Sequence, residues 1–179
     1  MKDLRARAFA QTLGASADLA AALEQLGFVQ ADPIRAPARA QDLILRHRVA
    51  GYRAGDLERR FARLPVEEDY LYAYGFLPRD LAHLLHPRHD KASPDGIHVP
   101  KGLAAEVLAH VRERGPTHPA DLEAVFGRER AVNGWGQHSK ATTRALHFLQ
   151  HYGLVRVVRR DNGIRVYEAV AERPPPRTP

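Results

Sequence analysis

Residues 139–169 read SKATTRALHFLQHYGLVRVVRRDNGIRVYEA, and this stretch decides the fold that the sequence predicts for the second half of the chain. It opens on Ser139, whose hydroxyl is a typical helix N-cap, and apolar residues then recur at helical spacing as far as Tyr152. Gly153 follows at once, in a position where glycine commonly ends a helix. We therefore expect one amphipathic helix between Ser139 and Gly153.

A hairpin is predicted directly after this helix. Leu154–Arg159 and Ile164–Ala169 are rich in strand-forming residues. Between them, Asp161-Asn162-Gly163 is typical of a tight turn that joins two antiparallel strands.

Two more amphipathic helices are predicted upstream, at residues 101–114 and 119–126, and a loop is expected at residues 127–136. Helix, helix, helix, hairpin is the order of a winged-helix domain, which we place at residues 101–170. In such a domain the last helix enters the major groove of DNA and the hairpin contacts the backbone.

The third helix and the hairpin are both basic. The face of the helix opposite its apolar stripe carries Lys140, Thr143, Arg144, His147 and His151. The hairpin adds four arginines around its turn, namely Arg156, Arg159, Arg160 and Arg165. Side chains of these types meet phosphates and base edges, so we expect DNA contact here. A solvated face without a ligand, and a winged helix that binds only protein, are the alternatives.

The first half of the chain, residues 1–86, is predicted to be a further helical domain. Helices are expected at residues 4–13, 18–26, 39–48 and 56–64, with Ser16 capping the second and Asp32-Pro33 starting another. The aromatic run Tyr70, Tyr72 and Tyr74 is interpreted as core and rim, with base stacking as the alternative. Composition predicts a linker at residues 87–100 and a disordered tail at residues 171–179.

Composition narrows the classes of partner. The 27 Lys and Arg residues outnumber the 21 Asp and Glu residues, and a net charge of +6 favours a polyanion such as DNA. A general bias of the genome toward arginine is the alternative explanation. The absence of cysteine excludes disulfides, thiolate metal sites and cysteine nucleophiles. No apolar run approaches the roughly 18 residues that span a bilayer, so we expect a cytoplasmic protein without a membrane partner.

Two side chains in the first half are candidates for chemistry. Gln30 and Asp32 alternate along an extended segment, so they can share one face and hold a water molecule between an amide and a carboxylate. The alternative is that Asp32 only caps a helix at Pro33. The histidines His83, His86 and His89 lack a fourth ligand, so we expect no metal site and no cofactor.

Several blocks of the sequence resemble the winged-helix DNA glycosylases of the YcaQ/AlkZ-like group. The resemblance begins with residues 27–34 and 38–43, GFVQADPI and ARAQDL, and its most specific part runs from Gln30 to Arg39. Further matches are Arg48, Tyr52, Glu68, Phe76–Arg79, Gly115-Pro116, Asp121-Leu122, Gly134-Trp135, Lys140, Leu146, Gly153 and Arg165–Tyr167.

This resemblance implies a mainly α fold with small β-hairpins, arranged as tandem winged helices. It also implies hydrolysis of the N-glycosidic bond of alkylated or crosslinked purines in double-stranded DNA. Gln30 and Asp32 would be the catalytic residues. With Arg39 from the matching block, the expected DNA-binding residues are Arg39, Lys140, Thr143, Arg144, His147, Arg156, Arg159, Arg160 and Arg165.

The sequence departs from the family pattern at three places. It is expected to lack the further C-terminal region of longer members, Tyr72 stands where a histidine is usual, and Ala31 is a small residue between Gln30 and Asp32. A non-catalytic winged-helix protein, either a transcriptional regulator or a repair accessory, is therefore the alternative to an enzyme. A monomer is expected in either case.

Overall fold

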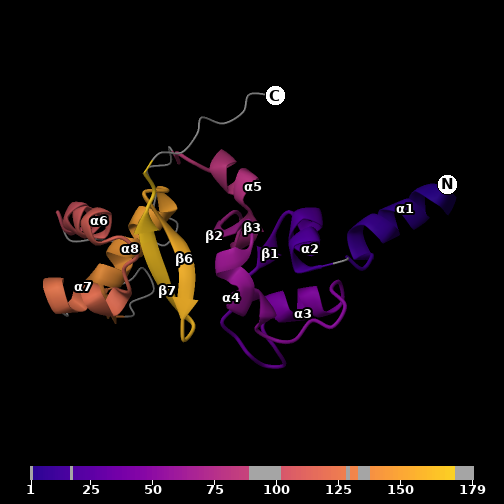
Figure 1. The fold of residues 1–179 in the computed structure, drawn as a ribbon, viewed down its shortest axis with the longest axis horizontal. Helices are drawn as coiled ribbons and strands as arrows, with labels where there is room; N and C mark the ends of the chain where they lie inside the picture. Colours follow the sequence, from indigo (N-terminus) through magenta and orange to yellow (C-terminus); the bar gives the residue numbers. More distant parts are fainter. Residues whose placement is uncertain (1, 17, 89–101, 128–129, 133–137, 172–179) are drawn as a thin grey trace. The chain divides into compact units, whose positions relative to one another are not determined.

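A computed structural model describes residues 2–16, 18–88, 102–127, 130–132 and 138–171 (Figure 1). The chain divides into two compact units, residues Met1–Leu84 and Leu85–Pro179. In the described parts both units are mainly helical and carry small antiparallel sheets, which confirms the predicted fold class at that level. No helix in these parts is long and apolar enough to cross a bilayer. The predicted linker and tail lie almost entirely outside the described residues.

The first unit contains several short helices. They are α1 (Lys2–Leu13), α2 (Leu19–Leu26), α3 (Ala40–Arg46), α4 (Asp56–Arg60) with a 3₁₀ turn (Phe61–Arg63), and α5 (Arg79–Leu84). Asp18, not Ser16, caps α2, because its Oδ1 accepts a hydrogen bond from the Ala21 N–H at 2.9 Å. Gly27 ends α2 in the left-handed conformation, as predicted.

A three-stranded antiparallel sheet completes this unit. Its strands are β1 (Val29–Gln30), β2 (Val66–Tyr70) and β3 (Tyr74–Pro78), in the order β1-β3-β2. The core between helices and sheet consists of fully buried apolar side chains, including Leu19, Leu23, Val29, Leu45, Leu57 and Phe76. The tyrosine-rich stretch is therefore a hairpin, and the rings of Tyr70 and Tyr74 pack 4.8 Å apart next to its turn.

The segment between β1 and α3 was expected to begin a helix at Asp32-Pro33, and this prediction is wrong. Residues 31–39 contain neither helix nor strand, and the next helix begins at Ala40. The Asp32 carboxylate accepts from the Ile34 N–H two residues on, at 2.8 Å. This local turn is the alternative to a helix cap that short polar side chains offer.

The second unit begins with α6 (Leu103–Arg114) and α7 (Pro119–Phe126) and continues with α8 (Ala141–His151), β6 (Val155–Asp161) and β7 (Ile164–Ala169). This order confirms the predicted helices and hairpin. α8 packs against α6 and α7 and also against β6 (Figure 1). Asn162 and Gly163, with φ of 51° and 83°, form the turn. Thr117 forms an isolated antiparallel β-bridge with Tyr167, so one residue pairs with β7 on the side opposite β6.

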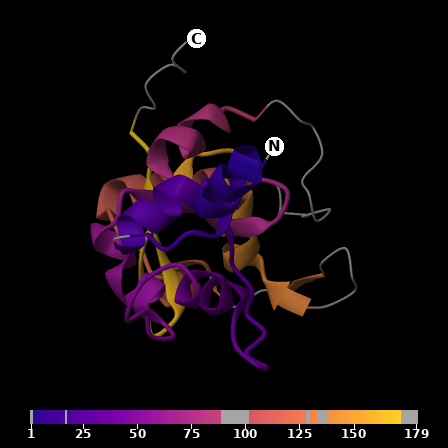
Figure 2. The ribbon, with the colours of Figure 1, turned by 90° about the vertical axis from the view of Figure 1, so that its right-hand side faces the viewer.

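A second small hairpin lies where a loop was predicted. β4 (Arg130–Val132) pairs with β5 (His138–Lys140), and Figure 2 shows this ribbon beside the start of α8. Ser139 belongs to β5, so it is not the helix cap that the sequence suggested. Lys140 occupies the cap position without a side-chain cap hydrogen bond. Trp135 lies outside the described residues.

Candidate functional site

Gln30 and Asp32 lie at the end of β1, the edge strand of the first sheet. β1 pairs with β3, so that Gln30 is opposite Gly75, and the Ala31 N–H donates to the Tyr74 carbonyl at 2.8 Å. A Cβ at Gly75 would come within 2.5 Å of the Val29 carbonyl oxygen and of the Phe28 ring. The absence of a side chain at Gly75 therefore allows β1 to lie this close to β3 and sets the position of Gln30.

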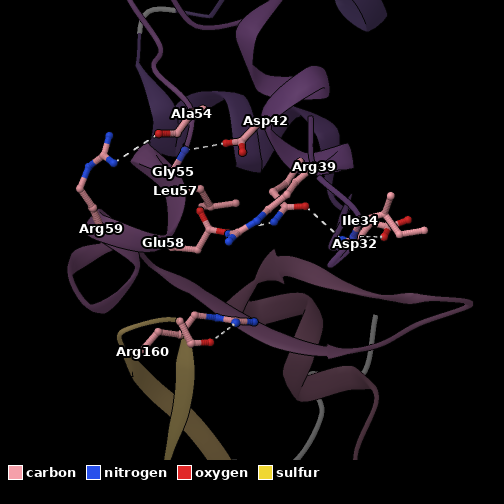
Figure 3. A network of polar contacts seen from close by, with 12 residues as sticks. Asp32, Ile34, Arg39, Asp42, Ala54, Gly55, Leu57, Glu58, Arg59 and Arg160 are labelled. Atoms are coloured by element: carbon pink, nitrogen blue, oxygen red, sulfur yellow. Dashed lines mark hydrogen bonds and ion pairs between the residues drawn. The ribbon is translucent and has the colours of Figure 1, made fainter. Parts of the chain in front are cut away.

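Asp32 is held through both its side chain and its backbone. Its Oδ1 accepts from the Ile34 N–H at 2.8 Å, and its own N–H donates to Oε1 of Gln41 at 3.1 Å (Figure 3). Gln30 is exposed and Asp32 is partly exposed, and within the described residues no hydrogen bond joins their side chains. The second carboxylate oxygen of Asp32 accepts no hydrogen bond from any residue that the structure describes.

The residues behind this loop form a largely buried polar chain. Gln41 is only 3% exposed, and its Nε2 donates to Oε1 of Glu58 at 2.9 Å. The same Glu58 oxygen accepts from Nη1 of Arg39 at 2.5 Å, and Figure 3 shows these two side chains pointing toward each other. Burial opposes ionisation of Glu58, but the hydrogen bonds from Gln41 and Arg39 outweigh it and hold the pKa of Glu58 below its usual range.

An open cavity of about 330 Å³ borders the same loop. It is lined by Arg35, Pro37, Ala38, Arg39, Asp42, Ala54 and Gly55. Asp42, one of the lining residues, is held in place because its Oδ1 accepts from the Tyr52 hydroxyl and from the Gly55 N–H, each at 2.8 Å. Burial and the hydrogen bond to Asp42 raise the pKa of Tyr52, so this hydroxyl stays protonated. The loop with the partly exposed carboxylate thus also borders a concave surface that Arg35 and Arg39 help to line.

The hairpin of the second unit carries its predicted arginines, and each has a partner. Arg156 pairs with Glu168 at 2.5 Å and Arg159 pairs with Asp161 at 3.0 Å. Arg160 donates to the Gly163 carbonyl at 3.0 Å. Lys140, at the start of α8, pairs with Glu123 at 2.5 Å. These contacts hold the basic side chains beside the turn and the helix, where Arg159 and Lys140 are about half exposed.

The predicted outward face of α8 requires a correction. Arg144 is only 4% exposed and His151 only 3% exposed, so neither lies on an accessible face of the helix. The physical reason is that α8 is covered on several sides. It contacts α6, α7 and β6, and also the β4–β5 hairpin that the sequence did not predict.

His147 and Arg165 line a second open cavity, of about 270 Å³, together with Thr143, Arg160 and other residues of the second unit. Nη1 of Arg165 lies 3.5 Å from Nε2 of His147. An arginine can only donate, so this contact requires a neutral imidazole. Burial and the charges of Arg165 and Arg144 lower the pKa of His147 to about 4, which agrees with that geometry.

The expected site residues therefore divide between the units. Gln30, Asp32 and Arg39 lie in the first unit, and the remaining DNA-binding candidates lie in the second. Sequence reasoning missed Gln41 and Glu58. Gln41 lies in one of the stretches that carry the resemblance, residues 38–43, but nothing in the sequence indicates that helix α4 brings Glu58 beside it. Among the described residues, no group of His, Asp and Glu side chains is arranged to hold a metal ion.

A family model described as "DNA glycosylase AlkZ-like" matches residues 23–179, which include the whole loop, the largely buried polar chain and the second unit. No solved structure matches the chain significantly.

Proposed function

The chain belongs to the family of AlkZ-like DNA glycosylases, and from this premise we propose that it hydrolyses the N-glycosidic bond of alkylated or crosslinked purines in double-stranded DNA. Membership implies DNA binding and a glycosylase-like role in DNA repair. The observation that carries the proposed chemistry is the Asp32 carboxylate, which is held by its loop through Oδ1 while its other oxygen remains available.

The proposed reaction needs only a carboxylate and an oriented water molecule. The oxygen of the water molecule attacks C1′ of the deoxyribose while the Asp32 carboxylate takes a proton from that water. The side-chain amide of Gln30 orients the water. The bond from C1′ to the base nitrogen breaks, and its electron pair neutralises the positive charge of an N7-alkylated purine. The products are the free base and an abasic site. The Asp32 charge also stabilises the oxocarbenium-like centre that forms on the sugar.

We further propose that each unit is a winged helix. In the first unit the sheet order is β1-β3-β2, and in the second the Thr117 position pairs with β7, which pairs with β6. In both cases a short strand early in the unit lies against the last strand of a hairpin. This shared order supports a tandem arrangement.

DNA binding is proposed for the basic surfaces of the second unit together with Arg39. The candidates are Arg39, Lys140, Thr143, His147, Arg156, Arg159, Arg160 and Arg165. Arg144 is not carried forward, because it is buried. In the second unit, Lys140, Arg156 and Arg159 form ion pairs with protein carboxylates, and a DNA phosphate takes the place of the carboxylate when DNA binds, so these side chains keep a charged partner in both states.

The experiment is base release from duplex DNA that contains one N7-methylguanine, read as strand cleavage after alkali. We expect cleavage by the wild-type protein and a loss of about 10²- to 10⁴-fold in the Asp32→Asn variant, the range typical of general acid–base catalysis. The Gln30→Ala variant should be slower than wild type but measurable. DNA affinity serves as the control and should be unchanged in both variants.

Two outcomes would contradict this proposal. If Asp32→Asn is as active as wild type, the carboxylate is not part of the reaction. If the wild-type protein releases no base yet binds duplex DNA, it is a non-catalytic DNA-binding member of the family. The tyrosine at position 72, where a histidine is usual, motivates this alternative.

A further inference from the structure

The polar chain behind the Asp32 loop ends on a backbone atom of Asp32 itself. Among the described residues, the Asp32 N–H has one acceptor, Oε1 of Gln41. Gln41 is fixed in turn because its Nε2 donates to Glu58, which Arg39 also binds. One amide side chain therefore connects the candidate catalytic residue to a part-buried ion pair between Arg39, at the start of α3, and Glu58 on α4.

We propose that Gln41 and Glu58 are positioning residues for the glycosylase reaction, holding the backbone of Asp32 so that its carboxylate faces the sugar. This inference rests on the function proposed above. Neither residue touches the reacting atoms, since Gln41 is 3% exposed and the Glu58 side chain is 12% exposed.

The loop needs such an anchor because it has no regular structure of its own. Residues 31–39 form no helix or strand, and the bond from Ala31 to Tyr74 is the last ladder-like contact of β1. The turn from Asp32 to Ile34 fixes the carboxylate relative to the loop, but it does not fix the loop relative to the domain. Gln41 does that, because it sits on α3, whose Leu45 is part of the core.

Glu58 determines which end of the Gln41 side-chain amide faces the Asp32 N–H. A glutamine amide can be turned by 180°, which exchanges its donor and acceptor. The ionised Glu58 can only accept, so Nε2 must face Glu58 and Oε1 must face the Asp32 N–H. The lowered pKa of Glu58 keeps this preference across the neutral range. Displacements of about 1 Å at a reacting group can cost about 10²-fold in rate, so a fixed orientation matters for chemistry.

The test compares matched variants in single-turnover base release, with DNA affinity measured alongside. Gln41→Met keeps the size of the side chain and removes both hydrogen bonds. We expect a rate at least ~10-fold lower with an unchanged dissociation constant, as for a loss of positioning. Thr117→Val is the control, because it removes a buried hydrogen bond, from Thr117 to the Gly115 carbonyl, in the other unit. It should keep the wild-type rate.

Glu58 is tested by a pair of substitutions. Glu58→Met removes the acceptor of Gln41 and should slow base release. Glu58→Gln restores an acceptor, and its amide nitrogen can take the place of Oε2, which is buried and accepts no hydrogen bond from the described residues. Because a glutamine amide at position 58 can itself be turned by 180°, this variant should recover part of the rate and lie between Glu58→Met and wild type. Equal rates in the two variants would overturn the orienting role of Glu58.

Hydrogen exchange at the Asp32 amide gives a readout that does not depend on catalysis. The amide should be protected in the wild-type protein and exposed to exchange in Gln41→Met. If Gln41→Met does not fold, Gln41→Asn replaces it, because an amide one methylene shorter cannot reach both partners.

The experiments distinguish a failure of the positioning inference from a failure of the proposed function. If Asp32→Asn is inactive while a folded Gln41 variant keeps the full rate, this inference is wrong and the proposed function stands. An unprotected Asp32 amide in wild type overturns the inference as well. If Asp32→Asn is fully active, the proposed function fails first. A Gln41 variant that loses affinity and rate in equal proportion indicates a general structural role and overturns positioning.

Discussion

His147 is a side chain whose titration couples the stability of the fold to pH. Its ring lies against Arg165 in the second unit, and burial together with the two arginine charges lowers its pKa to about 4. An unfolded histidine has a pKa near 6.5, so the folded protein resists a protonation that the unfolded chain accepts. Below pH 6.5 the unfolded state therefore binds more protons, and stability falls as the pH drops toward 4.

The His147→Gln variant tests this linkage. Glutamine can still accept from Arg165 but does not titrate in this range. Between pH 7 and pH 4.5 the wild-type protein should lose about 2 kcal/mol more unfolding free energy than the variant, from the shift between the two pKa values. Denaturant unfolding at a series of pH values measures the difference. Parallel pH profiles for the two proteins would show that His147 titrates normally in the fold.

At the scale of elements, the long periodic segments could be predicted and the short strands could not. The spacing of apolar residues predicted α6, α7 and α8, and Asn162-Gly163 predicted the β6–β7 turn. β2 was missed because it contains Glu67, Glu68 and Asp69, which disfavour strands, although all three are buried. β1 was too short for a pattern of its own. It exists because β3 provides hydrogen bonds beside it.

The choice of helix caps was also not readable from residue type alone. Ser16 and Asp18 both suit an N-cap, and tertiary contacts decided between them. The Ser16 backbone N–H donates to the Arg48 carbonyl at 2.7 Å, and its hydroxyl donates to Gln25. Ser16 therefore belongs to the packing between segments, which leaves the cap position to Asp18.

The close pairing of β1 with β3 predicts that Gly75 is sensitive to substitution. In Gly75→Ala the new methyl group would meet the Val29 carbonyl and the Phe28 ring, so β1 has to move away from β3. We expect a loss of about 1–3 kcal/mol in unfolding free energy, the usual range for overpacking, together with slower base release because Gln30 moves. Gly163→Ala is a useful comparison, since no atom lies near its Cβ position but its φ is positive. Wild-type base release in a folded Gly75→Ala protein would contradict the link between this pairing and the site.

At the scale of the whole molecule, the charge supports binding to a polyanion, but the reaction could not be predicted from composition. A net charge of +6 is compatible with many nucleic-acid partners. The catalytic candidates came from the resemblance in the block around Gln30 and Asp32. The contact between the buried Gln41 and the part-buried Glu58 required the structure, because the two residues are 17 positions apart in the chain.

The charge of the whole chain predicts a steep salt dependence of DNA binding. The logarithm of the binding constant should fall linearly with the logarithm of salt concentration, as bound counterions are released from DNA. Replacing both Arg159 and Arg160 by alanine should reduce the slope by about 1–2, near 0.9 for each lost phosphate contact. This slope is measured by titrating labelled duplex DNA with the protein at salt concentrations from about 50 to about 300 mM. A slope unchanged by the double substitution would remove the β6–β7 hairpin from the DNA surface.

The turn that Asp32 makes with Ile34 has a consequence for which acidic residue can occupy position 32. Glutamate carries the same charge as aspartate, but its extra methylene group does not fit a ring that closes on the N–H two residues ahead. What the loop selects is therefore the reach of the side chain as much as its charge. Sequence comparisons that score aspartate and glutamate as near equivalents would misjudge this position, because a glutamate here gives an anion without a fixed direction.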